Sequence, residues 1–261
     1  MEQKIYRIKP VFEERMWGGQ HLIEKYHYQT ELKNIAESYC CIAIPNHLDC
    51  DVIDTGDKLS DFYHQNRELF GSDTDDIPIR LTVESVLDNM SVQIHPEDEY
   101  ALEHFHQYGK PGGILYLEGT PTDLLLGHHA KTKEEFIQWN ETRQFDKLFR
   151  FVDYVPGDFI HIPANTLHSF RIRGIMIAFA RNSDVTLRLY DYDRIGKDGK
   201  KRELHIDKAL DVADLHGSAE PRQPLRVLKY RPGMASELLI RCKYFEVYRM
   251  LINGVCQEVQ R

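Results

Sequence analysis

The sequence predicts an all-β fold, either a sandwich or a closed barrel, with a few helices inserted between the strands. Short runs of alternating apolar and polar residues recur along the 261-residue chain, and turn signals such as Pro156-Gly157-Asp158 separate many of them. Aromatic residues, which are frequent in strands, make up 11% of the chain. Many short strands with few helices are typical of a sandwich or barrel.

The expected elements follow from these patterns. Strands are predicted over 39–44, 79–86, 91–95, 114–118, 123–126, 150–155, 158–162, 168–173, 175–180, 185–192, 237–242 and 244–252. Helices are predicted over 59–70, 97–107 and 132–139. Thr132 and Glu135 have the spacing of a capping box at the start of the third helix.

The chain is expected to contain one main domain and a short C-terminal part. Residues 1–215 carry most of the predicted strands and should form the main domain. Residues 216–236 include three prolines and read as a linker, and 237–261 read as an appendage or a partial second β-domain. A segment of about 25 residues cannot bury a core of its own. We therefore expect it to pack on the main domain or across a homodimer.

Composition and charge exclude several classes of partner. The formal net charge is −8, which argues against binding to nucleic acid or to an anionic membrane. The longest apolar run, Ile175–Ala180, is too short to cross a bilayer. The five cysteines are odd in number and form no CxxC pair, so a disulfide framework is not expected. A reducing cytoplasm is the location that this composition favours.

The most informative segment for chemistry is the predicted strand over 91–95. Alternate strand residues share a face, so Ser91, Gln93 and His95 should point to one side of the sheet. A polar face inside a barrel costs several kcal/mol unless its groups are satisfied. An imidazole and an amide oxygen two residues apart could satisfy that requirement by holding a metal or a polar ligand.

Two further segments add candidate groups. Residues 156–168 run through a turn, a strand and a Pro-led loop, and they contain His161 and His168. In the strand over 185–192, Arg188 shares a face with Thr186 and Tyr190. An arginine on a polar interior face is a candidate clamp for an anion or a substrate, although a structural ion pair is an equal alternative.

These motifs together resemble the type I mannose-6-phosphate isomerase family. The resemblance extends over roughly residues 1–215 and rests on segments that occur in the family's order. They are Trp17-Gly18-Gly19, SVQIHPEDEYA (91–101), GHHAKTKEEF (127–136), PGDFIHIPANTLHS (156–169), NSDVTLRLYDYDR (182–194) and RELHIDKALDV (202–212). The resemblance implies a cupin fold, a double-stranded β-helix of jelly-roll type, with a zinc site at one mouth of the barrel.

The resemblance also implies roles for particular residues. Gln93, His95 and His168 match zinc ligands of the family, and Arg188 matches its active-site arginine. Arg188 is thus the expected catalytic residue. Arg188 and Trp17 are the expected contacts with a sugar or sugar phosphate.

Three positions depart from the family pattern. Gly112 stands where the family has a glutamate ligand, Thr82 aligns with a lysine, and Ala178 aligns with another glutamate. The remaining ligands are all neutral, so zinc should bind weakly or be absent. Restoring the carboxylate by Gly112→Glu is expected to tighten zinc binding.

Three hypotheses about function remain. The first is a zinc-dependent isomerase of a hexose 6-phosphate with weak or lost activity. The second is a non-catalytic protein that binds a sugar or sugar phosphate on the same scaffold. The third is a different metal reaction in which His161 replaces the missing ligand, against the simpler reading of His161 as a core histidine.

Overall fold

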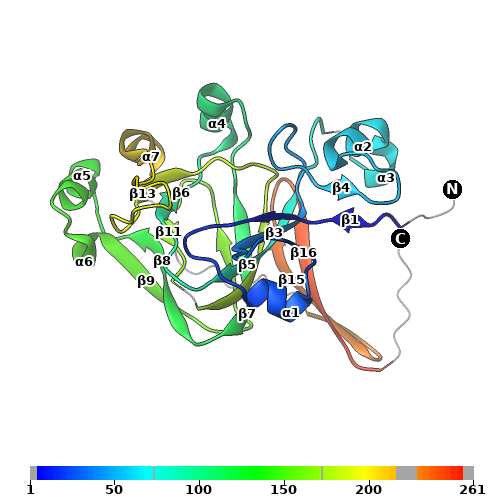
Figure 1. Cartoon of the computed structure of the whole chain (residues 1–261). Helices are drawn as coiled ribbons and strands as arrows, with labels where there is room; N and C mark the ends of the chain where they lie inside the picture. The colour runs from blue at the N-terminus through cyan, green and yellow to red at the C-terminus, as the bar shows by residue number, and fades with distance from the viewer. Residues whose placement is uncertain (1–4, 73, 172, 216–227, 255–261) are drawn as a thin grey trace.

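Two antiparallel sheets form the main body of the protein in a computed structural model that describes residues 5–72, 74–171, 173–215 and 228–254 (Figure 1). The larger sheet has the strand order β10 (Phe159–Ile162), β7 (Gly112–Gly119), β12 (Gly174–Ala180), β5 (Arg80–Val86), β3 (Glu37–Cys41) and β2 (Val11–Glu13). The smaller sheet has the order β13 (Leu187–Tyr190), β6 (Val92–Ile94), β11 (His168–Ser169), β8 (Thr122–His128) and β9 (Phe149–Tyr154). The predicted all-β cupin class is confirmed.

Short helices lie around the sheets. They are α1 (His21–Tyr26), α2 (Leu59–Gln65), α3 (Arg67–Phe70), α4 (Asp98–Phe105), α5 (Lys133–Glu141), α6 (Phe145–Leu148) and α7 (Ile206–Val212). The capping prediction for α5 is confirmed in its first half, because the Thr132 hydroxyl accepts a hydrogen bond from the Glu135 N–H at 3.2 Å. The side chain of Glu135 bonds the N–H of Lys131 instead of the N–H of Thr132. No described helix combines the length and the apolar character needed to cross a membrane.

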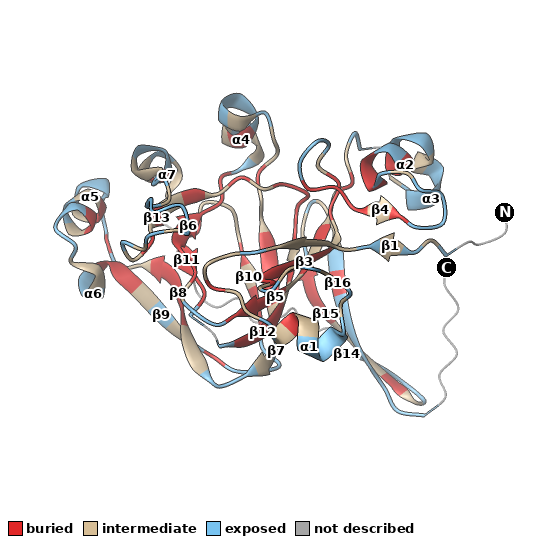
Figure 2. Ribbon diagram, viewed as in Figure 1, coloured by how far each residue is buried: buried red, intermediate tan, exposed pale blue. Residues whose placement is uncertain are grey.

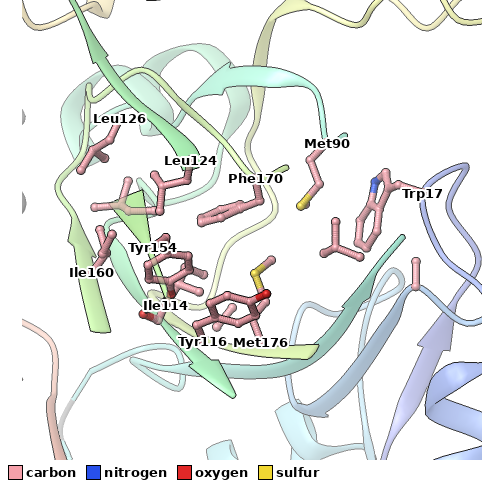
Figure 3. Packing of buried hydrophobic residues seen from close by; sticks show 14 residues of the cluster. Trp17, Met90, Ile114, Tyr116, Leu124, Leu126, Tyr154, Ile160, Phe170 and Met176 are labelled. Carbon is pink, nitrogen blue, oxygen red and sulfur yellow. Dashed lines mark hydrogen bonds between the residues drawn. The ribbon is translucent and has the colours of Figure 1, made fainter. Parts of the chain in front are cut away.

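The main core lies between the two sheets, where apolar side chains from both meet (Figure 3). The Tyr116 and Tyr154 rings stack there with centroids 4.9 Å apart. Figure 2 shows that buried residues concentrate in the strands of the two sheets, whereas the helices are buried on one side only. Two further strands, β1 (Ile8–Lys9) and β4 (Asp51–Val52), pair beside α2 and α3 over a separate core cluster.

The predicted strand over 168–173 is wrong in length. Strand β11 ends at Ser169, and it pairs with β6 and β8, with His168 opposite both Gln93 and Leu126. The Phe170 side chain turns into the main core instead of continuing the ladder. Apolar spacing alone could not separate a strand residue from a core residue of the following loop.

The C-terminal part packs on the outer face of the larger sheet, as expected. It consists of β14 (Leu228–Arg231), β15 (Met234–Arg241) and β16 (Glu246–Ile252). Leu239, Ile240 and Val247 form a cluster with Phe159 of β10, and Leu115 and Phe179 pack against it. Of the expected linker over 216–236, residues 228–231 and 234–236 lie in strands, while 216–227 fall outside the described residues.

A polar contact holds the same part in place at one end. The Tyr244 hydroxyl donates to the carboxylate of Asp98 at the start of α4, and the other oxygen of Asp98 accepts the Gly109 N–H at 3.1 Å. The Arg181 guanidinium lies between the rings of Tyr108 and Tyr244, at 4.3 and 5.4 Å from their centroids. The C-terminal strands are therefore tied to the loop that leads into β7.

Candidate functional site

A cavity of about 1040 Å³ is lined by residues from both sheets. Its wall includes the inward-facing side of β5, β6, β7 and β12, together with segments near Trp17 and Arg194. The predicted site residues Trp17, Gln93, His95, His168 and Arg188 all line it. The structure thus brings together groups that lie up to 171 positions apart in the sequence.

Strand register explains why three of these side chains are neighbours. Gln93 of β6 pairs with His168 of β11 on one side and with Arg188 of β13 on the other. Directly opposed residues of neighbouring strands present their side chains on the same face. Arg188, Gln93 and His168 therefore form a row across the smaller sheet. His95 directly follows the end of β6, two residues after Gln93, and lines the same cavity.

The two histidine rings lie close together, with their planes inclined by 53° to each other. Their ring centroids are 4.9 Å apart. The Nδ1 atom of His95 bonds the Val185 carbonyl at 2.9 Å, and that of His168 bonds the Thr166 carbonyl at 3.0 Å. A carbonyl partner fixes the proton on Nδ1 and leaves the lone pair on Nε2, which is the arrangement that metal-ligating histidines use.

Burial also keeps both imidazoles neutral. It lowers the pKa of His168 to about 4, and it lowers the pKa of His95 well below the usual value, with the nearby charge of Lys110 acting in the same direction. A neutral imidazole is the form that binds a metal ion.

Gln93 completes a possible donor set. Its Oε1 accepts from the Ser91 hydroxyl at 3.0 Å, and its Nε2 lies 3.5 Å from Nε2 of His95. A serine hydroxyl can donate or accept, so the amide can turn its oxygen toward the histidines without losing its partner. Two imidazoles and one amide oxygen fit a three-ligand metal site, although no charged ligand is among them. Within the described ranges, no cluster of three or more His, Cys, Asp or Glu side chains could hold a metal ion.

Arg188 is half-buried and keeps part of its guanidinium available. Its Nη1 donates to the Glu203 carbonyl at 2.9 Å. Its Nε is buried and has no hydrogen-bond partner in the described part of the chain. Burial and the neighbouring Arg202 both lower the pKa of Arg188. An anion bound here would satisfy the charge and the free donor together.

Trp17 belongs both to the main core and to the wall of the cavity. Its side chain is 3% exposed and belongs to the main core cluster (Figure 3). Trp17 is also one of the residues that line the cavity. The turn that contains Trp17 is bonded to the end of β5, because the Trp17 carbonyl accepts a hydrogen bond from the N–H of Leu87, the residue after β5, at 2.8 Å. The contact between Trp17 and a substrate stays a prediction.

The hypothesis that His161 replaces the missing metal ligand is wrong, because His161 is not among the residues that line the cavity. Ile160 and Ile162 on either side of it belong to the main core cluster, and Ile162 lines the cavity. Strand alternation therefore turns His161 toward the opposite face of β10, away from His95 and His168.

Gly112 has no room for a side chain. A Cβ atom at this position would lie 2.4 Å from the Phe179 carbonyl oxygen and 3.0 Å from the Ala180 Cβ of β12. The expectation that Gly112→Glu simply adds a ligand is therefore wrong, because the backbone of β12 would have to move first. The other two departures, Thr82 and Ala178, are a directly opposed pair on β5 and β12, and both are buried.

Sequence reasoning missed a set of charged residues in the cavity wall. They are Arg15, Glu37, Arg80, Glu84, Lys110 and Asp184. Arg80 is 2% exposed and donates to the Ser183 carbonyl at 3.0 Å and to Asp184 at 3.3 Å. The available signal was the alternation of β5, where Arg80, Thr82 and Glu84 share one face and Leu81 and Val83 the other.

Glu84 and Lys110 differ from the rest of this set. Neither side chain has an ion-pair or hydrogen-bond partner among the residues that the structure describes. Burial raises the pKa of Glu84 to about 8, and the negative charge of Glu37 adds to this effect. Burial lowers the pKa of Lys110 to about 8, and the positive charge of Arg80 adds to this effect.

These pKa shifts predict an unusual dependence of stability on pH. Between about pH 4.5 and 8 the unfolded chain has lost the Glu84 proton while the folded protein keeps it, so the free energy of unfolding falls as pH rises. Between about pH 8 and 10.5 the folded protein has lost the Lys110 proton first, so the free energy of unfolding rises again. Each slope can reach about 1.4 kcal/mol per pH unit.

Urea denaturation at a series of pH values measures both slopes. Glu37, Arg80, Arg15 and Lys110 are the charges that act on Glu84. The Glu84→Gln variant should lose the falling slope below pH 8. An equal slope in the variant and the natural protein would contradict the assignment to Glu84.

Two antiparallel sheets around a cavity with two paired histidines and an amide define a cupin-type protein with a candidate metal site. No family model matches the chain. Individual proteins of known family, however, match it over most of its length. The chain is 34% identical over 257 residues to the mannose-6-phosphate isomerase ManA of Bacillus subtilis, spanning 95% of this chain and 79% of that protein. It is 31% identical over 245 residues to the mannose-6-phosphate isomerase of Streptococcus mutans, spanning 92% and 76%. The chain belongs to the mannose-6-phosphate isomerase family.

Solved structures agree with this assignment. A mannose 6-phosphate isomerase from Bacillus subtilis superposes with a TM-score of 0.89 at 28% identity, over 95% of this chain and 80% of that one. A mannose 6-phosphate isomerase bound with zinc and yttrium superposes with a TM-score of 0.68 at 13% identity, over 93% of this chain and 82% of that one, which shows the shared fold.

Proposed function

We propose that the protein binds a hexose 6-phosphate in its cavity and interconverts the aldose and ketose forms slowly, with one divalent metal ion. The observation that carries this proposal is the row of Arg188, Gln93 and His168 across the smaller sheet, with His95 beside it. The row puts a cation for an anionic ligand next to a set of neutral metal donors. Family membership supplies the substrate class to test.

Gln93, His95 and His168 are the residues that would hold the metal. Zinc is the first candidate, since a related structure contains it. When bound, such an ion polarises sugar oxygens as a Lewis acid. The Val185 and Thr166 carbonyls keep the two histidines in the ligand form, and Arg188 is the group proposed to bind the phosphate.

The slow rate follows from the donor set. Three neutral ligands leave the full charge of the ion uncompensated, so the affinity should be lower than with a carboxylate ligand. A weakly held ion is present in only part of the molecules at cellular metal concentrations. The rate constant should therefore be well below the value of roughly 10 per second at which enzymes centre.

The alternative is a non-catalytic sugar or sugar phosphate binding protein. The observation that favours it is the group of small and neutral residues at the three departing positions, Gly112, Thr82 and Ala178. Binding requires a shaped pocket with donors, whereas turnover also requires charge where the transition state develops it.

Zinc titration together with a coupled isomerase assay tests the proposal. Isothermal titration calorimetry should show one zinc ion per chain, and His95→Ala should weaken its binding by roughly 100-fold or more. The matched control is His129→Ala, because His129 is exposed and should leave zinc binding unchanged.

The outcomes separate the hypotheses. Isomerisation of mannose 6-phosphate that requires zinc supports the enzyme. Binding of mannose 6-phosphate without turnover at saturating zinc supports the binding protein. Zinc binding that is equal in His95→Ala and the natural protein contradicts the metal site.

A further inference from the structure

We propose that Glu84 is a catalytic residue of this cavity, the base that takes the carbon-bound proton of the sugar and returns it to the neighbouring carbon. This inference rests on the proposed function and adds to it a group that the family motifs above do not include. Glu84 lies on β5, in the sheet opposite the histidines, and its side chain lines the cavity.

The position of Glu84 is set by its strand neighbours. It is opposed by Glu37 of β3 on one side and by Met176 of β12 on the other. Only 4% of the residue is exposed, and the exposed part contributes to the cavity wall. Within the described ranges, no donor forms a hydrogen bond or an ion pair with its carboxyl group.

A purely structural role would predict a different arrangement. Arg80 is engaged by Asp184 at 3.3 Å and by Glu37 at 3.8 Å. Arg15 donates to Glu37 at 2.7 Å and also contacts Glu13. The nearby arginines are thus paired with other carboxylates, and the charge of Glu84 is not needed to balance them.

Withdrawing most of a carboxyl group from water without an ion-pair partner is costly. Proteins retain such a cost mainly where the group has a function. Lys110 faces the same cavity, also without a pairing partner among the described residues, and it interacts electrostatically with Glu84. A ligand that enters the cavity would meet one unpaired acid and one unpaired amine.

The two groups can complete an aldose–ketose isomerisation without a further reactant. The Glu84 carboxylate takes the proton from C2, the C2–H electron pair forms a C1–C2 double bond, and O1 takes a proton from the Lys110 ammonium. The resulting enediol then gives the O2 proton to the Lys110 amine while C1 receives the proton from Glu84. The product is the ketose, and both residues return to their starting states.

The local environment suits this role. Burial raises the pKa of Glu84 to about 8, so its ionised form is a stronger base than an ordinary glutamate. A base whose pKa lies near the working pH gives the best compromise between its ionised fraction and its strength. The raised pKa is a consequence of the same unpaired burial.

Deuterium exchange measures the proposed step directly. Mannose 6-phosphate carrying deuterium at C2 is incubated with the full-length protein and zinc, and loss of deuterium to water and its appearance at C1 are followed by NMR. The Glu84→Gln variant should lower both rates by about 1,000-fold. The dissociation constant for mannose 6-phosphate should change by less than about threefold, because the amide keeps the shape of the side chain.

Controls keep the test decisive. Glu118→Gln alters a half-buried glutamate of β7 that pairs with Lys25 and does not line the cavity, and it should leave the exchange rate unchanged. Glu84→Asp shortens the base and should give an intermediate rate, which tests the role even if Glu84→Gln folds poorly. Exchange in Glu84→Gln above a tenth of the natural rate would overturn the inference.

Two outcomes distinguish this inference from the proposed function. If the natural protein exchanges deuterium and Glu84→Gln exchanges it at more than a tenth of that rate, the role of Glu84 fails and the proposed function stands. If the natural protein does not bind mannose 6-phosphate, the proposed function fails, and the role of Glu84 in that reaction fails with it.

Discussion

Replacement of Arg80 by alanine is expected to lower the free energy of unfolding by about 3–5 kcal/mol. Arg80 is 2% exposed, and its guanidinium contacts Glu37, Asp184 and the Ser183 carbonyl. It also lies over the Tyr39 ring, 4.9 Å from the centroid. Removing it leaves two buried or half-buried carboxylates and a carbonyl without their cation, which is the costly way to break a buried pair.

Urea denaturation at pH 7 measures this loss. The matched control is Arg67→Ala, since Arg67 contacts Asp75 at 3.4 Å on the surface and its removal should leave stability nearly unchanged. If Arg80→Ala destabilises the protein no more than Arg67→Ala does, the contacts of Arg80 with Glu37 and Asp184 in the cavity wall do not stabilise the fold as expected.

Gly112→Glu should lower the free energy of unfolding by about 3 kcal/mol, and it should not tighten zinc binding. The close approach of β12 to β7 is the reason, because the Phe179 carbonyl oxygen occupies the space of the new Cβ. Backbone atoms in a paired strand cannot move aside as a flexible side chain can. Strand β12 is held on both edges, by β5 and by β7.

Thermal and urea denaturation together with zinc titration test this expectation. Thr186→Glu is the control, since it adds the same carboxylate to the cavity wall at a position that already carries a side chain. A Gly112→Glu variant that is as stable as the natural protein and binds zinc more tightly would contradict this expectation, because the backbone of β12 would then move aside at little cost.

Much of the fold was readable from the sequence because the inner face of each strand differs from its outer face. Strand β5 was predicted within one residue of its bounds, and β6 was placed with its polar side inward. Strand β11 was predicted too long, since a two-residue strand carries little periodicity, and no helix was predicted at the position of α7.

The part of the candidate site that could be predicted from local sequence is the one in which a single predicted strand carries alternating polar and apolar residues. Gln93 and His95 are two residues apart in the predicted strand over 91–95, so a shared face was expected from alternation, although β6 ends at Ile94. Their proximity to His168 and Arg188 followed from the family resemblance, and the structure brings all four into one cavity. Their roles as ligands and as a substrate contact remain predictions.

Other features depend on contacts between distant segments. The lack of space at Gly112 arises from Phe179, which is 67 positions away, and no local pattern reports it. The isolation of Glu84 depends on where Glu37 and Asp184 direct the nearby arginines. Propensity and spacing cannot supply such pairings, because they are set by tertiary packing.

Strands β7 and β12 separate the ligand cavity from the C-terminal cluster by a single layer of backbone. On one side stand Gly112 and Ala178, and on the other Leu115 and Phe179 pack beneath Leu239 and Val247. At Gly112 and Ala178 the inner side chains of this partition are small, whereas Ile114 and Met176 fill the core beside them, so the wall is thin only at the glycine and the alanine. The C-terminal strands thus support the thin part of the cavity wall from behind, through their packing against Phe179.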